Sequence, residues 1–166
     1  MTYDPQTFLI KTNIQASDYV TLTSFKHQPY NSSFVLNIPD NFSNGHFYNI
    51  TLDQLVSETD NALKKGYTIA LDCDVSEKTF SSKFGIAVLP QNIEDNEKAL
   101  TYIVTENNIS PEYRQQEFEN YNTTDDHLMH LVGLSKDSKG RLCYYTKNSW
   151  GPDSNQHGGY LHMTED

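Results

Sequence analysis

Hydrophobic and polar residues alternate with a period of two in two segments near the start of the chain. Residues 18–23 alternate clearly and residues 34–38 less regularly, and turn-forming residues follow each segment. Such alternation places every second side chain on the same face of a strand. Residues 67–73 are more continuously apolar, as in a largely buried strand, and residues 84–90 have the same character. The pattern therefore predicts strands in all of these segments.

A helical period marks residues 51–65, where apolar side chains recur every three to four positions. The stripe consists of Leu52, Leu55, Val56, Thr59, Ala62 and Leu63. Thr51 can cap the first turn, and Gln54 can complete a capping box with it. Gly66 follows the last helical turn as a left-handed stop. The sequence predicts a helix that packs one face on a sheet, and a shorter helix over 111–120 that begins with Ser110 as its cap.

The last forty residues have the pattern of a hairpin followed by one more strand. Residues 127–134 and 141–148 are the two strands of the hairpin, and residues 159–163 are the additional strand. Depending on the centre of the turn, His127 lies directly opposite Asn148 or diagonally across from it on the same face. The β-carbons of such pairs are about 5 Å or about 7 to 8 Å apart. His127 and Asn148 are therefore expected to meet in either register.

Composition limits the class of protein. Twelve Lys and Arg against 22 Asp and Glu give a net charge of -10, which repels phosphate backbones and argues against a nucleic-acid partner. The apolar runs are far shorter than the ~20 residues that cross a bilayer, so no membrane partner is expected. An aromatic content of 12% is typical of a folded core. Residues 91–109 are polar and predict an excursion over the surface.

A histidine next to an asparagine has a chemical use. The amide oxygen can hold one ring nitrogen and leave the other free to exchange a proton with a nucleophile. Because asparagine is neutral, it suits a histidine that must carry a positive charge beside a thiolate. The alternative is that His127 is a structural histidine bonded to a polar neighbour, and hairpin geometry alone favours that alternative.

Neither cysteine has the surroundings of a nucleophile or of a metal ligand. Cys73 and Cys143 lie 70 residues apart with no CxxC spacing, so neither a zinc site nor a disulfide framework is expected, although one bridge stays open. Cys73 follows a strand and not a helix N-terminus, which favours a core thiol. Cys143 has the opposite strand parity to Asn148 and is expected to pack.

Two further features resemble sites but have simpler explanations. His130 lies three positions after His127, and on a strand the two rings point to opposite faces and cannot share a metal ion. Asp125 and Asp126 could form an acidic rim for a substrate's amino group, although a solvated loop is the simpler account. No cofactor and no metal are expected.

Several segments resemble papain-like cysteine peptidases. The sequence KNSWG at 147–151, together with Asp126-His127 and Gly133, is similar to the second half of that family. Further similarity to the bleomycin hydrolase and aminopeptidase C branch covers nearly the whole chain, at DYVTL (18–22), Pro29-Tyr30, 51–65, CDV (73–75), Lys78 and Phe80. The resemblance implies that His127 is the general base, that Asn148 orients it and that Trp150 shields their hydrogen bond.

One part of the family pattern is missing. The family's nucleophile lies in a CGSCW-type segment at the start of a helix, with an oxyanion-hole glutamine shortly before it, and this sequence has neither. Residues 1–166 are therefore expected to be a single domain, the C-terminal His/Asn-bearing half, with the cysteine-bearing half absent. The fold class implied is α+β: an antiparallel sheet curled into a partial barrel with flanking helices.

The resemblance implies part of a cysteine-type aminopeptidase that hydrolyses peptide bonds with a Cys-His-Asn mechanism. This chain alone is expected to be inactive. The alternative is a noncatalytic binding or interaction domain. Expected partners are peptide substrates, the missing cysteine-bearing domain and further copies of the chain, since several members of the branch form hexamers. Resemblance also implies a cytoplasmic location, while an upstream signal peptide and exopeptidase or endopeptidase character stay open.

Overall fold

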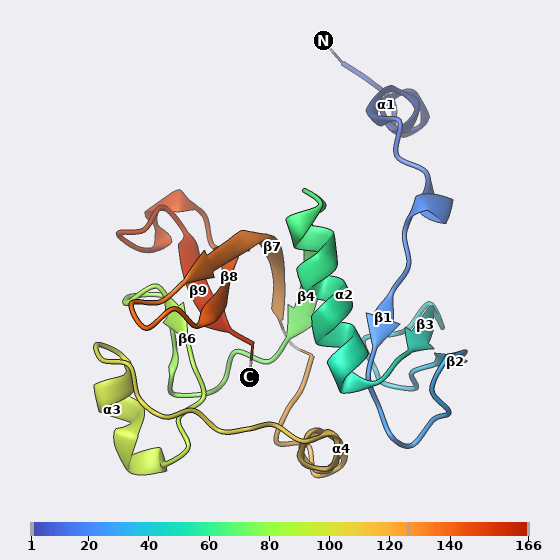
Figure 1. Cartoon of the computed structure of the whole chain (residues 1–166). Coiled ribbons are helices and arrows are strands. Elements are labelled where there is room, and N and C mark those ends of the chain that lie inside the picture. The colour runs from blue at the N-terminus through green and yellow to red at the C-terminus, as the bar shows by residue number, and fades with distance from the viewer. Residues whose placement is uncertain (1, 126, 166) are drawn as a thin grey trace.

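Two sheets with helices beside them make up the molecule (Figure 1), which a computed structural model describes over residues 2–125 and 127–165. The first sheet has the order β1-β3-β2. Its strands are β1 (Leu22–Thr23), β2 (Ser32–Val35) and β3 (His46–Asn49). Strand β3 pairs in parallel with β1 and antiparallel with β2.

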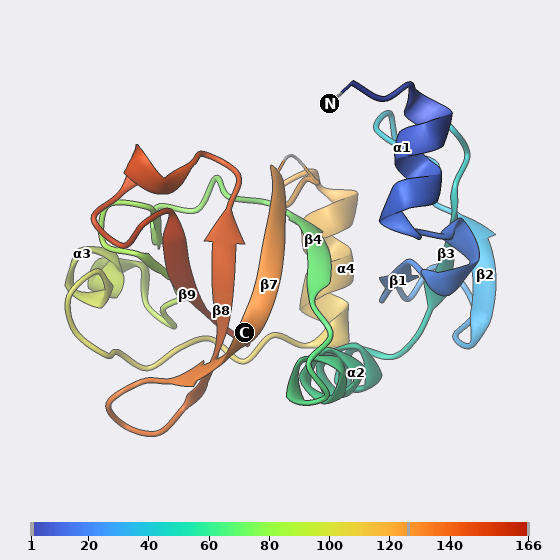
Figure 2. The same cartoon turned by 90° about the horizontal axis from the view of Figure 1, so that it is seen from above.

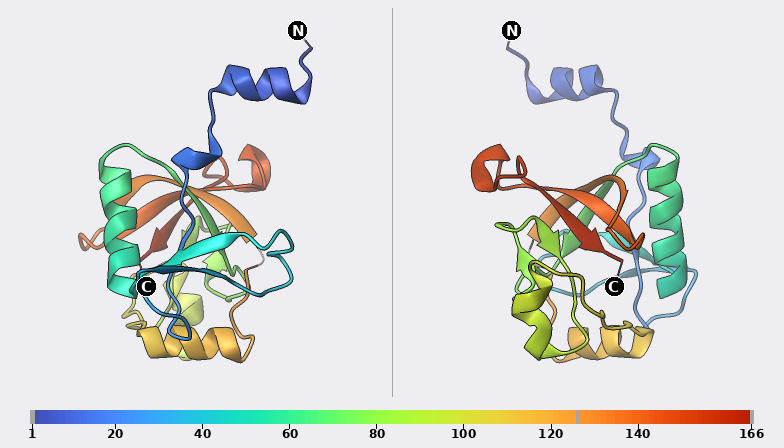
Figure 3. Two further views of the ribbon diagram at one scale, coloured as in Figure 1. Left: turned by 90° about the vertical axis from the view of Figure 1, so that its right-hand side faces the viewer. Right: turned by 60° about the vertical axis from the view of Figure 1, so that its left-hand side comes forward.

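The second sheet carries most of the core and has the order β4-β7-β8-β9-β6-β5. Its strands are β4 (Ile69–Cys73), β5 (Phe80–Ser81), β6 (Ile86–Ala87), β7 (His127–Lys136), β8 (Leu142–Asn148) and β9 (Tyr160–Thr164). All pairs are antiparallel except β6 with β9. The sheet is strongly twisted (Figure 3), and among the described residues β4 and β5 do not pair to close it. The α+β class with an incompletely closed sheet is therefore confirmed.

Helix α2 (Leu52–Lys64) is the helix that the period of three to four predicts. The backbone N–H of Gln54 donates to Thr51 Oγ1 at 3.3 Å, and the N–H of Thr51 donates to Gln54 Oε1 at 3.1 Å. Gly66 ends the helix with φ +86°. The apolar face packs against the second sheet, where Leu63 forms a core cluster with Leu131 and Tyr144.

A second core cluster lies on the same sheet next to the start of β7. Met129 packs with Ala87 and Leu161, and Cys73 and Phe80 lie at its edge. Because side chains alternate along a strand, the residue two positions before Met129 points to the same face. Strand β7 therefore directs His127 toward the core side of the sheet.

The first 50 residues differ most from the predicted elements. The strand expected at 18–23 is shortened to β1 at residues 22–23, and a 3-10 helix occupies Ala16–Asp18. The strand expected at 34–38 is Ser32–Val35. Strand β3 was not expected. Both short strands depend on β3, because β1 and β2 pair with it and not with each other. Alternation within a segment does not indicate that dependence.

The strands expected at 67–73 and 84–90 are shorter than predicted. Strand β4 is not buried on both faces, because α2 covers one face while Ala70 and Asp72 on the other are exposed. Strand β6 contains only two residues. The excursion over 91–109 forms a 3-10 turn at Ile93–Asp95 and the short helix α3 (Asn96–Ala99) at the edge of the molecule (Figure 2).

Helix α4 (Pro111–Glu119) begins as predicted, with the N–H of Tyr113 donating to Ser110 Oγ at 3.1 Å. Its contacts are with the segment that follows β1. The Phe118 ring lies 4.5 Å from the Phe25 ring between centroids, and Gln115 Oε1 accepts from the N–H of Lys26 at 2.7 Å. These contacts join the first sheet to the loop that leads into β7.

Helix α1 (Pro5–Thr12) stands apart from both sheets (Figures 1 and 3). None of its residues is buried, and Phe8, Leu9 and Ile10 are 55%, 55% and 80% exposed. A helix of this length is marginal in water without tertiary contacts. The apolar side chains of α1 thus lack cover within the described residues. No helix in the described part of the chain is long and apolar enough to cross a membrane.

Acid should weaken the turn of the β7–β8 hairpin. The carboxylate of Asp137 accepts from Arg141 Nε at 2.6 Å and from the backbone N–H groups of Lys139 and Arg141 at 2.7 and 3.0 Å. The Arg141 bond is the main cause that holds the pKa of Asp137 below its usual value, while burial opposes it. A lowered folded-state pKa contributes stability above the unfolded pKa of about 3.9, and this contribution is lost as the pH falls through the folded value.

We therefore expect the Tm of the wild type to fall between pH 5 and pH 3 more than that of Asp137→Asn. Thermal unfolding followed by circular dichroism measures both, with the exposed Asp40→Asn as the matched control. Equal falls in the wild type and Asp137→Asn would exclude this role of the turn.

Candidate active site

His127 and Asn148 meet at one end of the second sheet. Asn148 pairs with Met129, and a β-bulge shifts the register between Leu131 and Gly133. His127, two residues before Met129, is therefore the diagonal neighbour of Asn148. His127 Nε2 lies 2.7 Å from Asn148 Oδ1, so the expected contact is present.

The protonation of the ring follows from a second contact. The backbone N–H of Ser149 donates to Asn148 Oδ1 at 2.7 Å, so this atom must be the amide oxygen. An oxygen acceptor requires that His127 Nε2 carry the proton. Nδ1 of the neutral ring is therefore left with its lone pair, which can accept a proton from a nucleophile.

The hydrogen bond is protected on the side of the asparagine. Asn148 is 2% exposed, whereas His127 is half-buried. A buried hydrogen bond is electrostatically stronger than one in water. The amide is fixed by its place at the end of β8, and it therefore holds the imidazole in one orientation.

Trp150 covers one side of the histidine. Its ring centroid lies 5.0 Å from that of His127, with planes at 49°, and 6.1 Å from that of Phe80 in an edge-to-face contact. The Trp150 side chain is nevertheless 51% exposed. The contact is with the His127 ring, and shielding of the His127–Asn148 hydrogen bond by Trp150 stays a prediction.

Cys73 lies on strand β4, which pairs with β7 on the edge opposite to β8. Cys73 is directly paired with His127 in the β4–β7 ladder, so β4, β7 and β8 place Cys73, His127 and Asn148 on neighbouring strands. Sequence reasoning did not anticipate this pairing, because nothing local links strands more than 50 residues apart. Cys73 packs against the Met129 cluster at a strand end and has no helix dipole to stabilise a thiolate.

The sequence model of the Peptidase C1-like family matches residues 2–166. The chain belongs to the Peptidase C1-like family. Among solved structures it is similar to PepW from Lactobacillus rhamnosis HN001, with a TM-score of 0.71 and 20% identity. The alignment covers 98% of this chain and 35% of the PepW chain. A search of curated proteins gives no match.

The Peptidase C1-like assignment supports a papain-like cysteine peptidase, and the similarity to PepW supports the fold. The chain spans about a third of the length of the PepW chain.

Other candidate residues of this Peptidase C1-like chain lie away from the His127–Asn148 pair. Cys143 is buried, and burial raises the pKa of its thiol. His130 is exposed on the opposite face from His127, as the strand spacing predicts, and pairs with Ala70 and Lys147. Within residues 2–125 and 127–165, no group of three or more His, Cys, Asp or Glu side chains could hold a metal ion. Asp126, for which an acidic rim with Asp125 and a solvated loop are the alternatives, lies outside the described residues.

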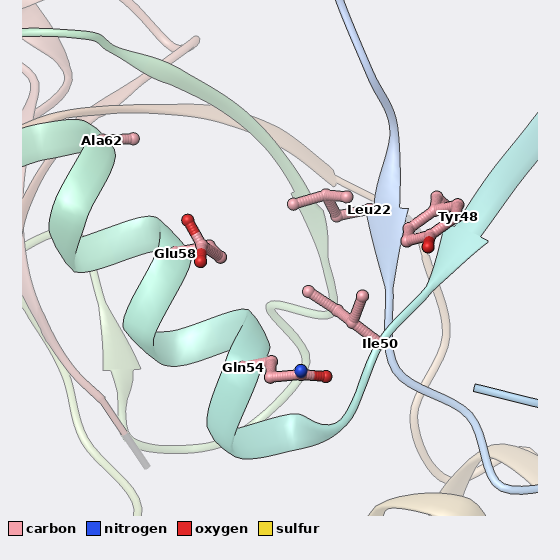
Figure 4. A pocket seen from close by; sticks show the side chains of 6 residues that line it. All are labelled: Leu22, Tyr48, Ile50, Gln54, Glu58 and Ala62. Carbon is pink, nitrogen blue, oxygen red and sulfur yellow. The ribbon is translucent and has the colours of Figure 1, made fainter. Parts of the chain in front are cut away.

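An open groove of about 420 Å³ lies between α2 and the first sheet (Figure 4). It is lined by Leu22, Tyr48, Ile50, Gln54, Glu58 and Ala62. No lining residue belongs to β7 or β8. The groove is thus separate from the His127 site at the end of the second sheet.

Proposed function

We propose that this chain supplies the general base and its orienting amide to a peptidase whose cysteine nucleophile lies in another part of the enzyme. The observation that carries the proposal is the 2.7 Å contact from His127 Nε2 to Asn148 Oδ1, which leaves Nδ1 available. A histidine oriented by a neutral amide is the arrangement that a thiolate–imidazolium pair requires.

The reaction follows from this arrangement. The thiol proton moves to His127 Nδ1, and the thiolate attacks the peptide carbonyl carbon. His127 then returns the proton to the leaving amine, and an acyl-enzyme remains. His127 next takes a proton from water, whose oxygen attacks the acyl carbon and releases the acid product and the thiolate. His127 returns the proton to the sulfur, which restores the thiol and the neutral ring. Asn148 holds the ring in one orientation throughout.

Three observations favour a nucleophile from outside the described residues. Cys73 is the last residue of β4 and Cys143 lies within β8, so neither cysteine lies at the N-terminus of a helix. Trp150 is half-exposed beside the base, and α1 exposes apolar side chains that a second domain would cover. The aligned region accounts for only 35% of the PepW chain. Together these observations support a cleft of which this chain forms one wall and the cysteine-bearing part of the enzyme forms the other.

The substrate class rests on resemblance to the bleomycin hydrolase and aminopeptidase C branch. That resemblance supports removal of residues from the free amino end of peptides, in a cytoplasmic homo-oligomer. The discriminating measurement compares aminoacyl fluorogenic substrates with free and blocked amino groups. Hydrolysis of the free amine alone supports an aminopeptidase, whereas equal rates contradict it.

The function is tested by assaying the chain alone and together with the cysteine-bearing part of its parent enzyme. We expect no turnover by the chain alone and hydrolysis that a thiol-blocking reagent stops in the mixture. Hydrolysis by the chain alone that His127→Ala abolishes would contradict the proposal. A stable complex without hydrolysis would favour the alternative of a noncatalytic interaction domain.

A further inference from the structure

Asp74 lies directly after β4 and bonds to the loop that enters β7. Its Oδ2 accepts from the backbone N–H of Thr124 at 2.8 Å and from Thr124 Oγ1 at 3.3 Å. Its Oδ1 accepts from the backbone N–H of Ser76 at 2.6 Å. One carboxylate thus joins the exit of β4 to a residue three positions before His127.

The hydrogen bonds between Asp74 and Thr124 lie at the end of the β4–β7 strand pairing. Cys73 and His127 form the last pair that the structure describes between β4 and β7. Terminal pairs of a sheet open more easily than central ones because neighbours hold them on one side only. The bonds from Asp74 to Thr124 lie just beyond this pair and replace the missing neighbour.

The same loop is anchored at its other end. The backbone N–H groups of Asn122 and Thr123 both donate to the carbonyl oxygen of Glu117, in helix α4, at 3.0 and 3.1 Å. Asn122 Nδ2 also donates to Glu117 Oε2 at 3.1 Å. Residues 122–124 are therefore held between α4 and Asp74.

The carboxylate is suited to remain ionised in this place. Burial works against ionisation, but the hydrogen bonds from Ser76 and Thr124 outweigh it and lower the pKa of Asp74. An ionised carboxylate accepts stronger hydrogen bonds than a neutral group does. The bridge is thus intact at neutral pH.

We propose that Asp74 is a positioning residue for His127, holding the start of β7 so that the imidazole stays on Asn148. The inference rests on the proposed function, because the role has a use only where His127 is the base. Asp74 itself touches neither substrate nor nucleophile in this account. It acts through Thr124 and the backbone of β7.

The chain alone provides the test, through the NMR signal of the His127 Nε2 proton. In the wild type we expect this proton to exchange slowly because Asn148 holds it. Asp74→Ala should speed its exchange about ten- to a hundredfold, the effect of two or three lost hydrogen bonds. Asp74→Asn, which keeps one acceptor oxygen, should give a smaller increase, and Asp40→Asn none.

The backbone N–H of Thr146, at the centre of the sheet, reports whether the fold is intact in each variant. Slow exchange of the His127 proton in folded Asp74→Ala would overturn the proposal. If Asp74→Ala does not fold, Asp74→Asn decides, and unchanged exchange there would overturn it. In the assembled enzyme, Asp74→Asn should lower kcat and leave KM unchanged. Because the NMR signal needs no substrate, it separates failure of this role from failure of the peptidase proposal.

Discussion

Replacing His127 with alanine is expected to lower kcat of the assembled peptidase by about a hundred- to ten-thousandfold. That range is the usual contribution of a positioned general acid and base. The ring holds a proton on Nε2 through the 2.7 Å contact with Asn148, so the lone pair on Nδ1 is the proton acceptor of the proposed reaction, and alanine removes it. Steady-state hydrolysis of an aminoacyl fluorogenic substrate measures the effect.

His130→Ala is the matched control, because His130 lies on the same strand with its side chain exposed on the opposite face. We expect this variant to keep the activity of the wild type. An unchanged kcat in His127→Ala, or an equal loss in His130→Ala, would contradict the assignment of the base.

The second large effect concerns stability of the first sheet. Asn49 is 0% exposed, and its amide makes four hydrogen bonds to the segment after β1. Oδ1 accepts from the N–H of Phe25 at 2.8 Å, and Nδ2 donates to the carbonyl oxygens of Phe25, Gln28 and Pro29 at 2.8, 3.0 and 3.2 Å. Alanine would leave the N–H and the carbonyl group of the buried Phe25 without these partners, which costs about 1 to 3 kcal/mol for each unsatisfied group. The carbonyl of the exposed Pro29 would keep its bond from Ser32 Oγ at 2.6 Å.

Asn49→Ala should therefore lower the free energy of unfolding by about 3 kcal/mol, since part of the loss is recovered by relaxation and water. Urea unfolding followed by circular dichroism measures it, with the exposed Asn37→Ala as control. A change below about 1 kcal/mol, within the range of ordinary surface substitutions, would show that the amide does not hold this sheet together.

Local chemistry made part of the fold predictable. Thr51, Gln54 and Gly66 are close neighbours in the chain, and the capping box and the left-handed stop that they form are seen in α2. The hairpin is also local, because a single turn joins β7 to β8. The sequence allowed two registers of the hairpin, with His127 either directly opposite Asn148 or diagonal to it. The structure has the diagonal register, with a bulge between Leu131 and Gly133.

Long-range pairing was not predictable in the same way. Strand β3 joins β1 and β2 into a sheet, yet no period within residues 46–49 distinguishes them from the preceding loop. The pairing of Cys73 with His127 depends on β4 lying beside β7, which α2 and the core arrange. The bridge from Asp74 to Thr124 joins residues 50 positions apart and has no signature in the sequence.

The candidate site also contains a local part that the sequence predicts and a long-range part that it does not. His127 and Asn148 could be found because they lie on one hairpin, and Trp150 follows Asn148 by two residues. The support around them comes from other elements: Phe80 from β5, Cys73 from β4 and Thr124 from the loop after α4. Residue types and spacing indicate the chemistry, while packing decides what holds it in place.

The pairing of His127 with a nucleophile from outside this chain is measured most directly by the pH dependence of thiol alkylation. The chain is used with Cys73→Ser and Cys143→Ala, together with the cysteine-bearing part of its parent enzyme. An imidazolium beside the thiol stabilises the thiolate, so iodoacetamide should react rapidly well below the ordinary thiol pKa of about 8.5. With His127→Ala, the reaction should be fast only near that ordinary value. If the chain with His127 and the chain with His127→Ala gave the same pH profile of alkylation, the assignment of His127 as the partner of the nucleophile would be contradicted.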